Sequence, residues 1–194
     1  DGLRRKTLGL EAVTDAYRVV HAEADSLSGL VVDRFGNRLA VALFSLGMQR
    51  WLPGIRAGLG RLYPGFPVHV RLDRRSVELD GMEPLPEAPA PAPTEILEHG
   101  LRFQVDLAEG HKTGFFLDQR DNRQAILPFL RGRRVLDAFC YTGAFGIFAL
   151  ARGAAAAVTA VDLDEKALAV AGANAALNGV RPEFRKADVF DFLR

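Results

Sequence analysis

Short apolar runs separated by glycine and proline turns fill the first half of the chain. Three runs, at 17–22, 30–35 and 39–45, have the length and β-branched content of strands, and Gly36-Asn37 between the last two is a tight-turn pair. A helical pattern follows at about 48–62 and another strand at 68–72. A short helix is expected within residues 1–14. This succession predicts a small α+β domain.

A proline-rich stretch separates this half from the next. Five prolines fall between residues 83 and 95, and a segment of that composition is stiff and extended. We therefore place an α+β domain at 1–88, a linker at 89–94 and a second domain at 95–194. The second domain is expected to open with a hairpin, 96–98 and 101–107, around His99-Gly100.

Buried strands alternate with helices in the second domain. A strand at Val135 and Leu136 runs into a glycine turn and an apolar helix that ends at Gly153. A strand at 156–161, a helix to about 177 and a strand at 183–187 follow. This βαβαβ order predicts an α/β fold, the first half of a Rossmann-like domain. Only one side of a doubly wound sheet is accounted for, so we expect a fragment of a longer protein. The uncovered first strand makes a homodimer an expectation.

Each of the three predicted strands ends in a carboxylate: Asp137, Asp162 and Asp188. The carboxyl ends of parallel strands are where nucleotide-like cofactors bind. A dinucleotide site needs glycines directly after the first strand, but the first glycine here is Gly143. A carboxylate at that place disfavours a pyrophosphate and suits a ligand with an ammonium and a sulfonium group, such as S-adenosylmethionine. Asp162 is placed to bind a ribose diol, and Asp188 an adenine amine. The alternative is that these acids only cap the following helices.

The run 109–123 is the second chemically dense segment. It sets Lys112, two phenylalanines and the polar side chains of Gln119 and Arg120 close together, while Asp118 is expected to cap a helix to about 129. The order of a Walker loop is missing. Aromatic rings between basic groups are suited to holding a base or cofactor ring near phosphate.

Composition narrows the function classes. The 194 residues carry a net charge of only +1, so any contact with nucleic acid has to be local. The sequence contains no apolar run of 18 residues, so it predicts no membrane span. The single cysteine, Cys140, suits a reducing, cytoplasmic location. No second His or Cys lies at ligand spacing from His99, so no metal site is expected.

Five segments together resemble a known family: 23–36, 98–100, 110–123, 135–145 and 188–193. They are similar to the S-adenosylmethionine-dependent 23S ribosomal RNA (cytosine-C5)-methyltransferases. The resemblance implies a central α+β domain and a Rossmann-like methyltransferase domain, with the family's RNA-binding PUA domain lying outside this chain. It also implies S-adenosyl-L-methionine as cofactor and ribosomal RNA as partner.

The resemblance assigns site residues by position. Those expected around the cofactor are Phe116, Asp118, Gln119, Arg120, Asp137, Ala138, Phe139, Cys140, Tyr141, Thr142, Gly143, Asp162, Leu163, Asp188 and Val189. Lys112 and Arg120 are expected to contact the substrate.

No catalytic residue is expected in this chain. Cytosine C5 methylation needs a thiolate that adds to C6, and the family's nucleophilic cysteine lies beyond Arg194. Cys140 sits in the cofactor loop and is not assigned that role. We therefore expect this chain alone to be inactive. Two other functions stay open: a non-catalytic RNA-binding or assembly module, and a nicotinamide-dependent oxidoreductase, which the missing early glycines disfavour.

Overall fold

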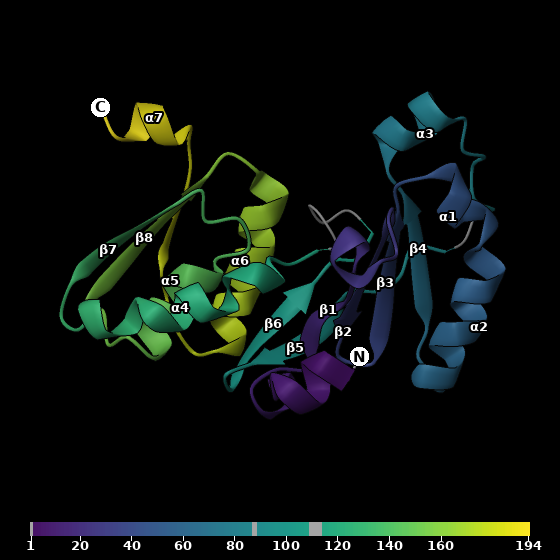
Figure 1. The fold of residues 1–194 in the computed structure, drawn as a ribbon. Coiled ribbons are helices and arrows are strands. Elements are labelled where there is room, and N and C mark those ends of the chain that lie inside the picture. The colour runs from purple at the N-terminus through teal and green to yellow at the C-terminus, as the bar shows by residue number, and fades with distance from the viewer. Residues whose placement is uncertain (1, 87–88, 109–113) are drawn as a thin grey trace. The chain divides into compact units, whose positions relative to one another are not determined.

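The computed structural model describes residues 2–86, 89–108 and 114–194, which form two compact units (Figure 1). The first unit comprises Asp1–His99 and Val105–Phe115, and the second comprises Gly100–Gln104 and Phe116–Arg194. The division thus falls in the hairpin that follows the proline-rich stretch. The domain limits at residues 88 and 95 stay a prediction.

A four-stranded sheet forms the first unit, in the order β1-β2-β3-β4. The first three strands are antiparallel and β4 runs parallel to β3. Two helices connect β3 to β4 and pack on the sheet, and a third follows β4 (Figure 1). The elements are β1 (Ala16–His21), β2 (Leu30–Phe35), β3 (Arg38–Leu43), α1 (Leu46–Arg50), α2 (Leu52–Leu62), β4 (Val68–Leu72) and α3 (Arg74–Asp80).

One local prediction in this unit is wrong: the segment before β1 forms a π-helical turn, η1 (Leu3–Thr7), and a 3-10 turn, η2 (Leu10–Ala12), instead of one helix. The predicted helix at about 48–62 is present as α1 and α2, which are separated at Trp51, and Pro53 lies in the first turn of α2. The Asp73 carboxylate starts α3, because it accepts the Ser76 N–H at 2.9 Å.

The second unit contains a parallel three-stranded sheet in the order β7-β8-β9. Helices α5 and α6 make the connections between these strands, which confirms the predicted α/β, βαβαβ fold (Figure 1). The elements are η4 (Leu117–Gln119), α4 (Arg120–Ala125), η5 (Leu127–Phe129), β7 (Arg134–Ala138), α5 (Ala144–Ala151), β8 (Ala157–Asp162), α6 (Glu165–Leu177), β9 (Glu183–Lys186) and α7 (Val189–Phe192). The two-stranded sheet before them pairs β5 (Thr94–Glu98) with β6 (Leu101–Val105). No helix among the described residues is both long and apolar enough to span a membrane.

Helix α5 lies at the centre of the second unit. Ile147, Phe148 and Ala149 are completely buried, as expected for a helix that is apolar on most sides. The Phe148 ring stacks on Phe103 of β6 with 5.9 Å between centroids. Because α5 follows β7 directly, this packing also fixes where the loop between them emerges.

A buried amide connects three segments of the second unit. Asn174 on α6 is fully buried; its Oδ1 accepts the Gln104 N–H at 2.7 Å, and its Nδ2 donates to the Thr142 carbonyl at 3.2 Å. The predicted pattern of apolar positions gives no hint of this residue, because a polar side chain breaks the apolar face of α6. Asn174 therefore holds the loop after β7 against α6 and β6.

We predict that Asn174→Ala lowers the free energy of unfolding by about 2 kcal/mol, because it leaves the partly buried Gln104 N–H and the buried Thr142 carbonyl without this partner. Urea unfolding followed by circular dichroism measures the change. The matched control is Asn122→Ala, since Asn122 is exposed and bonds only to the Gln119 side chain among the described residues; its effect should stay within about 0.5 kcal/mol. Equal losses in both variants would contradict this role.

Candidate cofactor site

The loop between β7 and α5 has an unusual backbone. Phe139 and Tyr141 adopt left-handed conformations with φ of 57° and 50°, which side chains other than glycine rarely take, and Gly143 follows at 77°. Three backbone hydrogen bonds hold the loop: Cys140 N–H to the Val161 carbonyl at 3.0 Å, Gly143 N–H to the Cys140 carbonyl at 2.8 Å, and Ile147 N–H to the Gly143 carbonyl at 2.9 Å. The loop thus bends from the end of β7 toward the end of β8.

Glycine is required where this loop enters α5. A Cβ on Gly143 would lie 3.0 Å from the Ala171 Cβ, and one on Gly146 would lie 3.1 Å from a carboxylate oxygen of Asp137. Both positions therefore keep the start of α5 close to the strands and to α6. The two glycines serve close packing.

Asp137 is the first predicted site residue, and its carboxylate lies under the start of α5. Its Oδ2 accepts the Gly146 N–H at 2.8 Å. Burial raises the pKa of Asp137 to about 6, and the negative charge of Asp162 adds to the rise, while the Gly146 N–H opposes it. Such a carboxylate gains most from a cationic partner, which would restore its ionised form.

Asp162 is the second predicted site residue, at the last position of β8. Its Oδ2 accepts the Tyr141 N–H at 2.7 Å and its Oδ1 accepts the Asp164 N–H at 3.0 Å. A carboxylate offers about four lone-pair positions, so each oxygen retains capacity for one further donor. Asp164 caps α6 by accepting the N–H groups of Lys166 and Ala167. Asp162 therefore does not cap this helix, and its Oδ2 binds the loop instead.

Asp188 is mainly a helix cap in this structure. It is exposed, lies two residues beyond β9, and its Oδ1 accepts the N–H groups of Phe190 and Asp191 at the start of α7. The alternative that this acid only caps the following helix is thus consistent with the hydrogen bonds of its Oδ1. Its role at an adenine stays a prediction.

The 116–123 segment reaches the same loop through an aromatic contact. The rings of Phe116 and Tyr141 meet edge to face with 5.3 Å between centroids. Arg123, almost fully buried, donates to the Phe116 carbonyl at 3.2 Å, and its guanidinium lies 5.7 Å from the Phe145 ring centroid. A buried guanidinium on an aromatic ring of α5 therefore fixes Phe116 beside Tyr141.

The sequence signals for Arg123 and Asn174 were weak. Arg123 stands in the distinctive 110–123 run, and only its burial shows that it positions Phe116. Asp118 was expected to cap a helix to 129. This is wrong, because Asp118 lies inside η4, while α4 begins at Arg120 and ends at Ala125, three residues before Pro128.

Arg120 and its neighbours form the polar edge of this segment. The Arg120 Nε is buried and has no hydrogen-bond acceptor among the described residues, although the Asp121 carboxylate lies 3.4 Å away. Gln119 is half-buried and Asp118 is exposed. An unused buried donor of this kind suits an anionic group of a ligand. Lys112, the other predicted substrate contact, lies outside the described residues.

The remaining predicted residues line the ends of the three strands. Phe139 and Leu163 are exposed, and Phe139 meets Phe190 of α7 edge to face at 5.8 Å. Val189 and Thr142 are buried, and Ala138 is half-buried at the end of β7. Exposed apolar rings beside buried carboxylates are the environment that a nucleoside with a charged tail requires.

Cys140 is not in a reactive state. Burial raises the pKa of its thiol to about 12, and the nearby charges of Asp137 and Asp162 act in the same direction. At neutral pH the sulfur is therefore a protonated thiol and a poor nucleophile. This agrees with the expectation that the chain contributes no catalytic cysteine.

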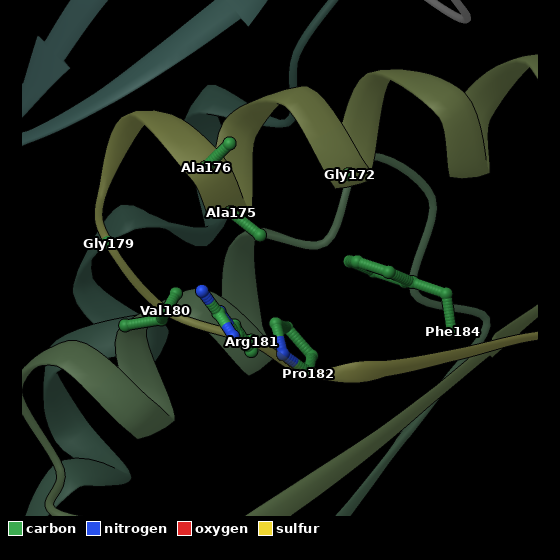
Figure 2. A pocket seen from close by; sticks show the side chains of 8 residues that line it. All are labelled: Gly172, Ala175, Ala176, Gly179, Val180, Arg181, Pro182 and Phe184. Carbon is green, nitrogen blue, oxygen red and sulfur yellow. The ribbon is translucent and has the colours of Figure 1, made fainter.

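The second unit also has a pocket away from these residues, with a volume of about 450 Å³ (Figure 2). It lies between the carboxyl-terminal end of α6 and the segment leading into β9, with the Phe184 ring at one side. Ligands of parallel sheets bind at the carboxyl ends of the strands, whereas this pocket is at the start of β9. It is therefore separate from the candidate site. Among the residues that the structure describes, no group of three or more His, Cys, Asp or Glu could hold a metal ion.

The loop, the paired carboxylates and the aromatic edge define a site for a nucleoside cofactor on a Rossmann-like sheet. Residues 66–188 match the model of the S-adenosylmethionine-dependent methyltransferase family. The chain belongs to this family, and the predicted cofactor, S-adenosyl-L-methionine, is confirmed for the family.

Two sets of similar proteins extend this result. Proteins named "Ribosomal RNA large subunit methyltransferase I" from Erwinia tasmaniensis and Shewanella frigidimarina are 40% and 41% identical over 98% and 92% of this chain. The chain spans about half the length of these relatives, 50% and 46% respectively. The crystal structure of SMU.776 complexed with SAH is 30% identical, has a TM-score of 0.80, and is matched over 97% of this chain and 50% of its own.

We predict that S-adenosylhomocysteine binds about tenfold more tightly at pH 7 than at pH 5. The ammonium group of the ligand is expected to pair with the ionised form of Asp137, whose pKa is about 6, so affinity should rise as the pH passes upward through that value. Calorimetric titration at a series of pH values measures the profile. Asp137→Asn should bind weakly and without this slope; an unchanged slope in that variant would assign the titration to another group.

Proposed function

We propose that this chain is the cofactor-binding half of an RNA methyltransferase that methylates C5 of a cytosine in large-subunit ribosomal RNA. The observation that carries the proposal is the pair Asp137 and Asp162 at the carboxyl ends of the adjacent parallel strands β7 and β8. Asp162 accepts the Tyr141 N–H and Asp137 accepts the Gly146 N–H, so both carboxylates are held at the loop between β7 and α5. The names of the relatives support ribosomal RNA as the substrate. The proposal places the protein in the cytoplasm and keeps a homodimer as an expectation.

In this proposal each acid holds a different part of S-adenosylmethionine. Asp137 faces the ammonium of the methionine part, Asp162 the ribose hydroxyls, and Asp188 with Val189 the adenine. Support comes from the burial of the Asp137 carboxylate and from the acceptor capacity that half-buried Asp162 retains.

The segment from Phe116 to Arg120 is proposed to cover the cofactor and the target base. The support is its edge-to-face contact with Tyr141 and the unused buried Nε of Arg120. Held in this way, the sulfonium methyl would face a cytosine C5 made nucleophilic by a thiolate on C6. Cys140 cannot supply that thiolate, because its pKa is raised to about 12.

The site also bears on the two alternative functions, a nicotinamide oxidoreductase and a non-catalytic RNA-binding module. A nicotinamide oxidoreductase is disfavoured by the family match and by the buried Asp137 where a pyrophosphate would lie. An RNA-binding module without cofactor would have no use for the carboxylate pair. The binding of S-adenosylhomocysteine separates it from a methyltransferase.

We predict that Asp162→Ala weakens S-adenosylhomocysteine binding by about 1 to 3 kcal/mol, because the ribose hydroxyls lose a buried acceptor. The matched control is Asp164→Ala: this acid also accepts two backbone N–H groups, but it caps α6 and does not join the loop. Calorimetry should show an affinity within about twofold of the wild type for the control. Equal affinities in all three proteins would contradict the assigned role.

We further predict that this polypeptide alone transfers no methyl group to ribosomal RNA, since it holds no activated thiolate. A tritium-transfer assay with labelled S-adenosylmethionine and unmodified large-subunit RNA measures this. Incorporation of label above a no-enzyme control would contradict the proposal that this polypeptide binds the cofactor but lacks the nucleophile.

A further inference from the structure

The first unit contains a long segment without any carboxylate. Between Asp33 and Asp73 the sequence has six arginines and no Asp or Glu, so this segment carries a charge of +6. The whole chain has a net charge of +1, which leaves −5 for all other residues. The positive charge is thus concentrated in one segment of the sequence, in which Arg34 is paired with Glu11 and the exposed arginines of α1 and α2 are available for a local nucleic-acid contact.

Three of these arginines are exposed on the helices that cover the sheet. Arg50 ends α1, and Arg56 and Arg61 lie on α2. None of them forms an ion pair within the described part of the chain. Other side chains of α2 face the protein interior: Leu59 belongs to the hydrophobic core of the first unit, and Ile55 packs against that core. The three guanidinium groups therefore face solvent with their donors unused.

An aromatic ring lies next to these charges. Trp51, between α1 and α2, is 71% exposed, although tryptophan is usually highly buried. The ring lies along the first turn of α2: a Cβ on Gly54 would be 3.7 Å from the Trp51 Cε3. The ring is thus within van der Waals reach of the α2 backbone at Gly54.

We propose that Trp51 and the arginines Arg50, Arg56 and Arg61 form a contact surface for single-stranded RNA, in which Trp51 stacks on an unpaired base and the arginines bind phosphates. The inference rests on the proposed function in that the bound RNA is the substrate. Unpaired bases stack on exposed aromatic rings, and a stacking site flanked by arginines is how proteins hold single strands. Arg56 and Arg61 are both on α2, about 7.5 Å apart along its axis by the helical rise, a spacing close to that of neighbouring phosphates in a single strand.

The test uses the intrinsic fluorescence of Trp51, because it is the chain's single tryptophan. Titration with a 20-nucleotide single-stranded RNA should quench this fluorescence, since a stacked base lies directly on the ring. A duplex of the same sequence should quench it at least fivefold less. Anisotropy of end-labelled RNA gives the affinity of variants that lack the tryptophan.

Two variants and a matched control separate this surface from general charge. Arg50→Gln, Arg56→Gln and Arg61→Gln combined should weaken binding at least tenfold and reduce the steepness of the log–log salt dependence by about 2. Trp51→Ala should weaken binding fivefold or more. The control combines Arg131→Gln, Arg133→Gln and Arg134→Gln, which are equally exposed and remove the same charge from the second unit; it should bind within twofold of the wild type.

Three results would overturn the proposal: RNA binding without any quenching of Trp51, equal losses in the two arginine triples, or quenching by phosphatidylserine vesicles but not by RNA. Circular dichroism melting shows whether each variant is folded. Calorimetry with S-adenosylhomocysteine on the same samples reads the cofactor site by itself. Quenching by RNA without cofactor binding would therefore retain this surface and reject the proposed methyltransferase function.

Discussion

The hydrogen bond from the Tyr141 N–H to the Asp162 carboxylate, 2.7 Å long, is the interaction on which the candidate site depends. It joins the loop after β7 to the end of β8 and fixes one carboxylate against a backbone that has two non-glycine residues in the left-handed region. The parallel pairing of β7 with β8 makes this possible, because it brings the carboxyl ends of both strands to one edge. The strain in the loop is offset by the hydrogen bonds and by the packing of α5.

Two buried side chains of the second unit hold the segments around this bond. Asn174 holds the loop from α6 through the Thr142 carbonyl, and Arg123 holds Phe116 beside Tyr141. Both side chains are buried and polar, so their hydrogen bonds are difficult to replace by water or by a neighbour. The site is therefore preorganised by residues that need not touch the cofactor themselves. Burial in this arrangement raises the pKa of Asp137 to about 6, although the Gly146 N–H stabilises its charge in part, so a cationic ligand would stabilise the ionised carboxylate further.

Periodicity and turn residues were enough to predict the strands of both units and the βαβαβ order, because most of the strands are apolar or alternating runs bounded by strong turn residues. The exception is β9 (Glu183–Lys186), which is mainly charged. The roles of Asn174 and Arg123 could not be predicted from the sequence. Asn174 bonds to Thr142, which is 32 residues away, and Arg123 packs on Phe145 of α5, so both roles depend on the tertiary fold. The helix expected after Asp118 is broken into three short pieces, since Pro128 and local packing override the capping pattern. For Asp188 the structure shows a capped helix where the sequence allowed both a cap and a ligand contact.

The central claim is that the edge formed by β7 and β8 binds an S-adenosyl cofactor. The most direct measurement is a calorimetric titration of the folded chain with S-adenosylhomocysteine at pH 7.5, and a parallel titration with NADH. The account predicts saturable, equimolar binding of S-adenosylhomocysteine and no heat of binding with NADH. Binding of NADH in place of S-adenosylhomocysteine, or of neither ligand by a sample with an intact circular dichroism spectrum, would contradict it.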